Sequence, residues 1–318
     1  MKGIRREEIL NYSGILRNLD GLLPYLREGF VYVEKDQSLT GDVPKLFLRE
    51  YQFGEAPKNK PNKWPAYIAK VGHKWYPVES VMEQLLTDLG KLYGLLIADS
   101  KLAIASGQLR FLSKYFLKKD ERLMHGAEIY AANLNEDIGF VEEIEENKMS
   151  PEFFTVSFTY EAFKNSFPEY YDELFCDLLE MLAFDAITGN NDRHFYNWGV
   201  ITDIHDINPP KYAPIYDTAR ALFWNFSDDK IENVARDDKL INIQIEKYGK
   251  KSKPKMGIEN LNNLNHFKFI EETYKRFPDH SKCITKVIKH SLEVDEAKLI
   301  DQEYRYLLSK DRRKLIKD

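Results

Sequence analysis

Cysteine is scarce in this chain, which has 318 residues but only two cysteines, Cys176 and Cys283. Two isolated cysteines make neither a metal site nor a disulfide framework, so we interpret both as packing residues. The chain also lacks any apolar run of about eighteen residues, and residues 1–8 contain no apolar core of a signal peptide. These absences argue against membrane spanning and secretion, and they predict a cytoplasmic protein.

Positive charge is not in excess either. The formal net charge is -5, which argues against direct binding of nucleic acid through a broadly basic surface. A local basic run at residues 247–255 has the composition of a solvated loop, with contact to a partner or to phosphates as the alternative. With 43% hydrophobic and 31% charged residues, the chain can form the core of one large domain or of two lobes.

The most informative segment is residues 189–197, with the sequence Gly-Asn-Asn-Asp-Arg-His-Phe-Tyr-Asn. Asp192 stands five positions before Asn197, and kinase-like folds use this spacing to place a catalytic carboxylate and a metal-binding amide on one loop. The Pro-Ile-Tyr-Asp of residues 214–217 then adds Asp217. Single Asn and Asp residues are common in turns, but the whole spaced set favours phosphoryl transfer.

The segments around this loop predict how it is held. Residues 198–204 and 211–216 are apolar or β-branched runs on either side of a polar turn, which is typical of a β-hairpin. Such a hairpin would bring Asp192, Asn197 and Asp217 around one Mg²⁺ ion. Mg²⁺ is usually bound by one or two carboxylates together with phosphate oxygens and water. In residues 171–187, apolar residues would lie around most of the circumference of a helix, which predicts a buried helix that ends at Gly189.

In the first part of the chain, residues 30–33 and 45–49 have strand composition and flank a loop that contains Gly41. A glycine lets the backbone approach the phosphates of a nucleotide closely, and an ordinary hairpin turn is the alternative. Residues 66–71 predict a further strand that carries Lys70. Its ammonium group would pair with nucleotide phosphates and a helical Glu, or it would lie on the solvent face of an edge strand.

A helix predicted over residues 78–95 offers two such carboxylates, Glu79 and Glu83, one turn apart. Glu83 fits the pairing with Lys70 better because it lies deeper in the helix, whereas Glu79 could merely complement the helix dipole. Residues 108–117, which include Phe116, predict a strand that leads into the adenine-binding hinge of a kinase. A plain buried strand explains the same residues.

For the whole chain, these patterns predict an α+β, two-lobed protein-kinase-like fold. A small β-rich N-lobe would span residues 1–117 and a mainly helical C-lobe residues 118–318. The first forty residues predict one or two helices with a break at Pro24, and residues 51–65 predict a surface loop. From about residue 121 the pattern is mostly helical, and residues 255–318 predict a small helical subdomain.

With these motifs in place, the chain resembles the HipA-like serine/threonine kinases, the kinase toxins of bacterial toxin-antitoxin pairs. Residues 38–45 are similar to the family's phosphate-loop signature, and residues 82–95 are similar to its regulatory helix. Residues 189–197 match its Gly-Asn-x-Asp-x-His-x-x-Asn catalytic loop, and residues 213–217 its Pro-x-Tyr-Asp metal-binding strand end. The resemblance covers about residues 30 to 225.

The resemblance implies a role for each motif residue in binding ATP and Mg²⁺. By this resemblance, Asp192 is the catalytic base or the carboxylate that positions the acceptor, His194 braces the loop, and Asn197 and Asp217 bind Mg²⁺. Lys70 binds the α- and β-phosphates, and Glu83 orients it. The further residues expected to contact ATP are Ser38, Thr40, Gly41 and Phe116. By the same resemblance, autophosphorylation is expected on Ser38, with Thr40 as the second candidate. It would shut the enzyme off, because a phosphate in this loop would repel the γ-phosphate and favour an expelled loop.

The resemblance also implies partners. The acceptor would be a Ser or Thr of a cellular protein, by analogy a translation component such as an aminoacyl-tRNA synthetase. An antitoxin protein would be a second partner, and nucleic acid would be contacted only through it. The chain before residue 30 is short for the N-terminal subdomain of the longer HipA proteins, so we expect a short form.

Two other classes of function stay open at this point. A small-molecule or lipid kinase of related architecture would show the same Asp-to-Asn spacing and the same later Asp. A pseudokinase that binds nucleotide or antitoxin without turnover is the other, although the presence of Lys70, Asp192, Asn197 and Asp217 argues against it. No Phe-Gly pair follows Asp217, which separates the chain from eukaryotic protein kinases.

Overall fold

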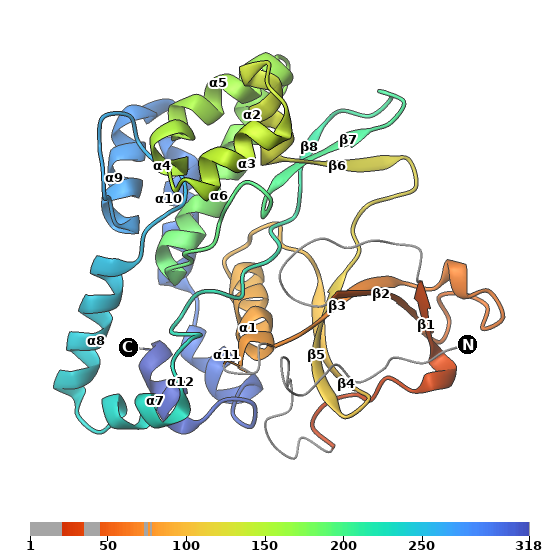
Figure 1. Cartoon of the computed structure of the whole chain (residues 1–318). Helices are drawn as coiled ribbons and strands as arrows, with labels where there is room; N and C mark the ends of the chain where they lie inside the picture. Colours follow the sequence, from red (N-terminus) through yellow and green to blue (C-terminus); the bar gives the residue numbers. More distant parts are fainter. Residues whose placement is uncertain (1–20, 35–44, 73–75, 77, 318) are drawn as a thin grey trace.

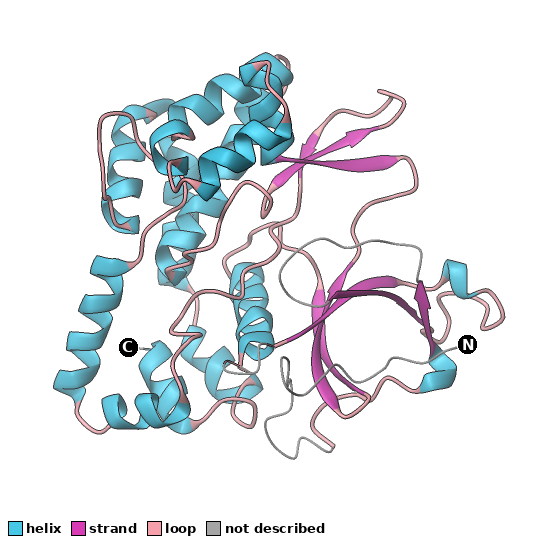
Figure 2. Cartoon of the chain, viewed as in Figure 1, coloured by secondary structure: helices cyan, strands magenta, loops and turns pink. Residues whose placement is uncertain are grey.

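The computed structural model describes residues 21–34, 45–72, 76 and 78–317. Within these residues, the first part of the chain forms one antiparallel sheet of five strands in the order β1-β2-β3-β5-β4, and helices make up most of the remainder (Figures 1 and 2). The strands of the sheet are β1 (Val31–Glu34), β2 (Lys45–Glu50), β3 (Ala66–Val71), β4 (Ser100–Ala105) and β5 (Gln108–Lys114). This mixed architecture confirms the predicted α+β fold.

Strand β3 lies in the middle of the sheet, paired with β2 on one side and β5 on the other. Its side chains alternate, so Tyr67, Ala69 and Val71 are buried on one face while Ile68 and Lys70 lie on the other. Lys70 is therefore not on an edge strand, and that interpretation of its position was wrong.

Helix α1 (Glu79–Leu92) packs against β4 and β5 and lies between the sheet and the helical part (Figure 1). Val81, Met82, Leu85 and Leu89 are buried at helical spacing and anchor this contact. The predicted helix over residues 78–95 is thus confirmed, with an earlier end. It places Glu83 against β3.

The helical part surrounds α6 (Tyr171–Thr188), which confirms the helix predicted over residues 171–187. Its apolar face packs against α5, α9 and α10, and the helix ends at Gly189, whose φ of 70° lies in the left-handed region that glycine favours. The other helices are α2 (Gly126–Leu134), α3 (Ile138–Glu146), α4 (Ser150–Phe153), α5 (Val156–Ser166), α7 (Asp228–Ala235), α8 (Asp238–Lys251), α9 (His266–Arg276), α10 (Ser281–Glu293), α11 (Glu296–Glu303) and α12 (Lys310–Lys317), with short 3-10 turns at Glu28–Phe30, Pro61–Lys63 and Pro278–His280.

A second sheet of three short strands stands beside the helical part and has the order β6-β7-β8 (Figure 1). The predicted hairpin is confirmed as β7 (Gly199–Asp203) and β8 (Lys211–Tyr212), both shorter than expected. Strand β6 (Glu121–His125) pairs with β7 from far away in the sequence. The loop before β7 and the segment after β8 are therefore held by one rigid ribbon.

Several predictions on the fold were wrong. Strands β4 and β6 were missed, because their modest strand composition is outweighed by pairing: β4 forms a hairpin with the next strand, β5, and β6 pairs with the distant strand β7. The basic run at residues 247–255 is a loop only in part, since α8 continues to Lys251 and residues 252–255 follow it without helix or strand. Residues 255–318 contain the predicted helices, and they pack on the preceding elements: α10 packs on α6, and Tyr304 donates a hydrogen bond to Asp88 of α1 with an O–O distance of 2.5 Å.

The two cysteines are also not independent packing residues. Cys176 of α6 and Cys283 of α10 form a disulfide, with their Cα atoms 5.6 Å apart and 107 positions of sequence between them. Sequence spacing carries no information on this pairing, because only the packing of α10 on α6 brings the two sulfur atoms together.

The predicted surface loop at residues 51–65 is observed, apart from its short 3-10 turn. Residues 1–20 of the predicted N-terminal helices lie outside the described residues, and Glu28–Phe30 forms a 3-10 turn where the remainder was expected to be helical. No helix in the described ranges is long and apolar enough to cross a membrane.

Candidate active site

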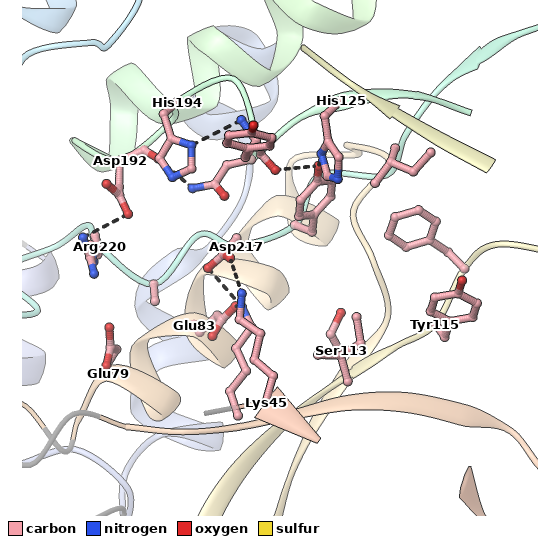
Figure 3. A pocket seen from close by; sticks show the side chains of 18 of the residues that line it. Lys45, Glu79, Glu83, Ser113, Tyr115, His125, Asp192, His194, Asp217 and Arg220 are labelled. Carbon is pink, nitrogen blue, oxygen red and sulfur yellow. Dashed lines mark hydrogen bonds and ion pairs between the residues drawn. The ribbon is translucent and has the colours of Figure 1, made fainter. Parts of the chain in front are cut away.

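A cavity of about 590 Å³ lies between the five-stranded sheet and the helical part. Its volume is within the range of pockets that hold small-molecule ligands. Strands β2 and β3, helix α1, the segment after β5, the loop after α6 and the segment after β8 all line it. Figure 3 shows the polar side chains of these elements pointing into the same space.

Lys70 is the centre of one charged group in this cavity. Its Nζ lies 2.7 Å from Oε1 of Glu83 and 3.0 Å from Oδ1 of Asp217. Nζ of Lys45 lies 3.7 Å from the other oxygen of Asp217. The structure thus places Glu83, and not Glu79, against Lys70, although Glu79 also lines the cavity.

These contacts divide the charge unequally between the two carboxyl groups. Burial acts to raise the pKa of Asp217, but Lys70 and Lys45 outweigh it and hold the pKa well below its ordinary value. Burial raises the pKa of Glu83 to about 7, despite the opposing effect of Lys70. Burial acts to lower the pKa of Lys70, yet Asp217 and Glu83 raise it above its ordinary value. Asp217 and Lys70 therefore remain charged at neutral pH.

Asp192 and His194 lie on the loop that follows α6 and line the opposite wall of the cavity (Figure 3). Oδ2 of Asp192 lies 3.2 Å from Nη1 of Arg220. Burial raises the pKa of Asp192 and lowers that of His194. Nδ1 of His194 accepts a hydrogen bond from the backbone N–H of Tyr196 at 3.2 Å, a local contact within the loop.

Asn197 and Asp217 line the same cavity and have the chemistry that Mg²⁺ requires. The side-chain nitrogen of Asn197 donates to the backbone oxygen of Asp192 at 2.7 Å, so the amide oxygen is the atom of this side chain with the chemistry to bind a hard cation. Asp217 is ionised and its side chain is 31% exposed toward the cavity. A hard cation takes oxygen ligands of these two kinds and completes its shell with phosphate and water. The described residues contain no cluster of three or more His, Cys, Asp or Glu side chains suited to a metal.

The segment after β5 forms the far end of the cavity. Ser113 of β5 and Tyr115, Phe116 and Leu117 after it line the cavity, and the centre of the Phe116 ring lies 5.9 Å from that of Tyr216. Phe116 therefore lines the cavity directly after β5, and its hinge role stays a prediction. Ser38, Thr40 and Gly41 of the expected phosphate loop lie outside the described residues.

Comparison with known proteins agrees with this geometry. A family model described as the HipA-like C-terminal domain matches residues 37–294. The chain belongs to this family. A comparison with curated proteins found no match.

Among solved structures, a match to CtkA shows the likeness in fold for this HipA-like chain. The Helicobacter pylori proinflammatory kinase CtkA matches with a TM-score of 0.70 and 15% identity, over 92% of this chain and 91% of CtkA. A chain from the complex of the Shewanella oneidensis toxin-antitoxin proteins HipA and HipB with operator DNA matches with a TM-score of 0.38 and 16% identity, over 88% of this chain and 64% of that chain. At this identity, the match to CtkA shows a shared fold.

Sequence reasoning missed several residues of this HipA-like site. Arg220 contacts Asp192, and Lys45 contacts Asp217. Nδ1 of His125 in β6 and the Tyr216 hydroxyl share a hydrogen bond of 3.1 Å. A buried ion pair between Asp185 and Arg193 was also missed. The available signal for this pair was a carboxylate within the otherwise apolar face of α6, which is costly unless paired.

Proposed function

We propose that this protein is a Mg-ATP-dependent kinase that transfers the γ-phosphoryl group of ATP to a Ser or Thr hydroxyl of another protein. The observation that carries the proposal is the joining of Lys70 to both Glu83 and Asp217 in a cavity that Asp192 and Asn197 also line. Kinases use a strand lysine paired with a helical glutamate, together with a loop Asp and Asn and a later metal-binding Asp.

Each of these groups has a task that its environment suits. The charged ammonium of Lys70 would neutralise the α- and β-phosphates, and Glu83 would orient it from α1. Asn197 and Asp217 would hold Mg²⁺, which neutralises charge on the transferring group when bound. Asp192 would accept a hydrogen bond from the acceptor hydroxyl and align its oxygen. Because burial raises the pKa of Asp192, this carboxylate is a better proton acceptor than an exposed Asp.

The finer parts of the proposal rest on family membership and on the sequence motifs. We include a cellular protein acceptor, by analogy a translation component, an antitoxin as a second partner, and a cytoplasmic location. We also include autophosphorylation on Ser38 or Thr40. The cavity supports a division into an N-lobe of residues 1–117 and a C-lobe of residues 118–318, because residues of both segments line it.

The test is incubation of the purified protein with Mg²⁺ and γ-labelled ATP, alone and with cell lysate, beside the Asp192→Ala and Asp217→Ala variants. We expect label on the protein or on a lysate band, and a loss of at least about 100-fold in either variant, because both act mainly in the transition state. Circular dichroism should show both variants folded. Unchanged labelling in either variant would refute its assigned role.

The same experiment separates the alternatives. Phosphorylation of a small molecule in lysate without any labelled protein would indicate a small-molecule kinase. Nucleotide binding without any transfer would indicate a pseudokinase.

A further inference from the structure

Arg193 lies directly after Asp192 in the chain, but its side chain points away from the cavity into the protein. Its Nε and Nη2 atoms donate to the two carboxylate oxygens of Asp185 at 2.8 and 3.0 Å. The exposed fractions of the two side chains are 2% for Arg193 and 1% for Asp185. This is a bidentate, buried ion pair, the geometry for which a planar guanidinium is suited and an ammonium is not.

The remaining nitrogen of the guanidinium reaches two backbone segments at once. Nη1 of Arg193 donates to the backbone oxygen of Asn197 at 2.7 Å and to the backbone oxygen of Tyr216 at 2.7 Å. Asn197 is one proposed Mg²⁺ ligand, and Tyr216 is bonded through its carbonyl to the other, Asp217. One nitrogen atom therefore ties together the backbones that carry both ligands.

Asp217 needs such support because its backbone is strained. Its φ angle is 55°, in the left-handed region that a residue with a side chain seldom adopts. A hydrogen bond to the carbonyl of the preceding residue fixes the peptide plane between Tyr216 and Asp217 and thereby the direction of the Asp217 side chain.

The other end of the bridge is rigid. Asp185 lies within the last turn of α6, and its carboxylate also accepts a hydrogen bond from the side-chain nitrogen of Asn190 at 2.8 Å. The backbone N–H of Asn190 donates to the backbone oxygen of Asp185 at 2.9 Å. The central helix thus holds the start of the catalytic loop and, through Arg193, its end.

We infer that Arg193 is a positioning residue that sets the separation of the Mg²⁺ ligands Asn197 and Asp217 by bridging their backbones to Asp185. This inference rests on the proposed function. Arg193 does not line the cavity, so its removal should weaken the metal site and leave the metal-independent part of nucleotide binding intact. Partners behind metal ligands typically change metal affinity by about 10–100-fold when they are substituted.

The experiment measures binding rather than turnover. A fluorescent, non-hydrolysable ATP analogue is titrated into the full-length protein in EDTA and at a series of Mg²⁺ concentrations, for the wild type and for Arg193→Lys. In Arg193→Lys, we expect the Mg²⁺ concentration that gives half of the maximal increase in analogue affinity to rise at least about 10-fold. The affinity for the analogue in EDTA should be unchanged.

Arg312→Lys is the matched control. Arg312 is also buried and also donates to two backbone oxygens, of Phe223 and Phe226, and to a carboxylate, that of Asp228. It does not line the cavity. We expect Arg312→Lys to lower thermal stability while leaving the Mg²⁺ dependence as in the wild type.

The outcomes separate the inference from the proposed function. If the affinity of the wild type for the ATP analogue does not change with Mg²⁺ concentration, the proposed function is overturned. If the affinity depends on Mg²⁺ equally in the wild type and in Arg193→Lys, the inference alone is overturned. The same holds if Arg193→Lys and Arg312→Lys show an equal shift in the Mg²⁺ dependence. If Arg193→Lys fails to fold, Asp185→Asn replaces it, since this change keeps the guanidinium but removes the charge that anchors it. The same Mg²⁺ shift is expected in Asp185→Asn, and its absence overturns the inference.

Discussion

At the scale of single residues, the ammonium group of Lys70 forms ion pairs with two carboxyl groups. Lys70 contacts Glu83 and Asp217, and the two carboxyl groups respond in opposite directions, with the pKa of Asp217 lowered and that of Glu83 raised to about 7. Asp217 has a second cation, Lys45, and is less enclosed, so its charged form is favoured. Near neutral pH without ligand, Lys70 is therefore balanced mainly by Asp217, and Glu83 is the group that titrates.

This inequality predicts a pH dependence of stability. Because the pKa of Glu83 is about 7 in the folded protein against an ordinary value of 4.5, the folded state binds more protons than the unfolded state between these values. The free energy of unfolding should therefore fall as pH rises from about 4.5 to about 7, by up to about 3 kcal/mol. Glu83→Gln cannot titrate and should lack this fall.

Urea unfolding of the wild type and Glu83→Gln at pH 5 and pH 7 would measure this difference. The wild type should lose stability relative to the variant between the two values. Parallel behaviour of the two proteins would mean that Glu83 ionises at an ordinary pKa.

At the scale of elements, α6 is joined to its neighbours by more than apolar packing. The disulfide between Cys176 and Cys283 joins it to α10, and an ion pair at 2.7 Å between Lys286 and Glu180 joins the same two helices. Because α6 ends directly before the loop that carries Asp192 and Asn197, this link holds the helix from which the cavity-lining loop begins. Disulfides are rare in reducing compartments, so the redox state of this pair bears directly on where the protein works.

We predict that Cys176→Ser lowers the free energy of unfolding by about 2–4 kcal/mol under oxidising conditions. The physical reason is the loop of 107 positions that the bond closes, which restricts the unfolded chain. Chemical denaturation with and without reductant would measure the effect, and Cys283→Ser should match Cys176→Ser. Two free thiols in the denatured, unreduced wild type would show that the bond does not form in the purified protein.

At the scale of the whole molecule, the cavity joins two parts of different construction. One wall comes from an antiparallel sheet and α1, and the other comes from loops held by α6 and the β6-β7-β8 ribbon. The ion pairs between Lys70 or Lys45 and Asp217 span the cavity from one wall to the other. A nucleotide bound here would contact both walls and stabilise the whole molecule.

We therefore predict that Mg-ATP raises the melting temperature of the protein. At a ligand concentration of about 100 times the dissociation constant, the stabilisation should be about 2.7 kcal/mol. Lys70→Met should abolish most of this shift, because under the proposed function it removes the cation that would meet the phosphates. Scanning calorimetry of both proteins measures the effect, and an equal shift in the two would place the nucleotide elsewhere.

The sequence alone was sufficient where the relevant information is local. Asp192 and Asn197 share one short loop, and their spacing is a property of that loop alone. The buried helix at Tyr171–Thr188 and the strand at Ala66–Val71 follow from apolar periodicities within single segments. The α+β fold was predictable for the same reason, since it follows from the order of such segments along the chain.

Tertiary structure alone decided which distant groups meet. The choice of Glu83 over Glu79, the contact of Lys70 with an Asp217 that lies 147 positions away, and the disulfide all depend on how elements pack. Strand β6 pairs with β7 across the intervening helices, and its own composition did not predict it. Periodicity records only which face of a segment is apolar. The partner of each buried charge depends on the packing of the whole chain, because such a group must find whatever opposite charge the fold brings within reach.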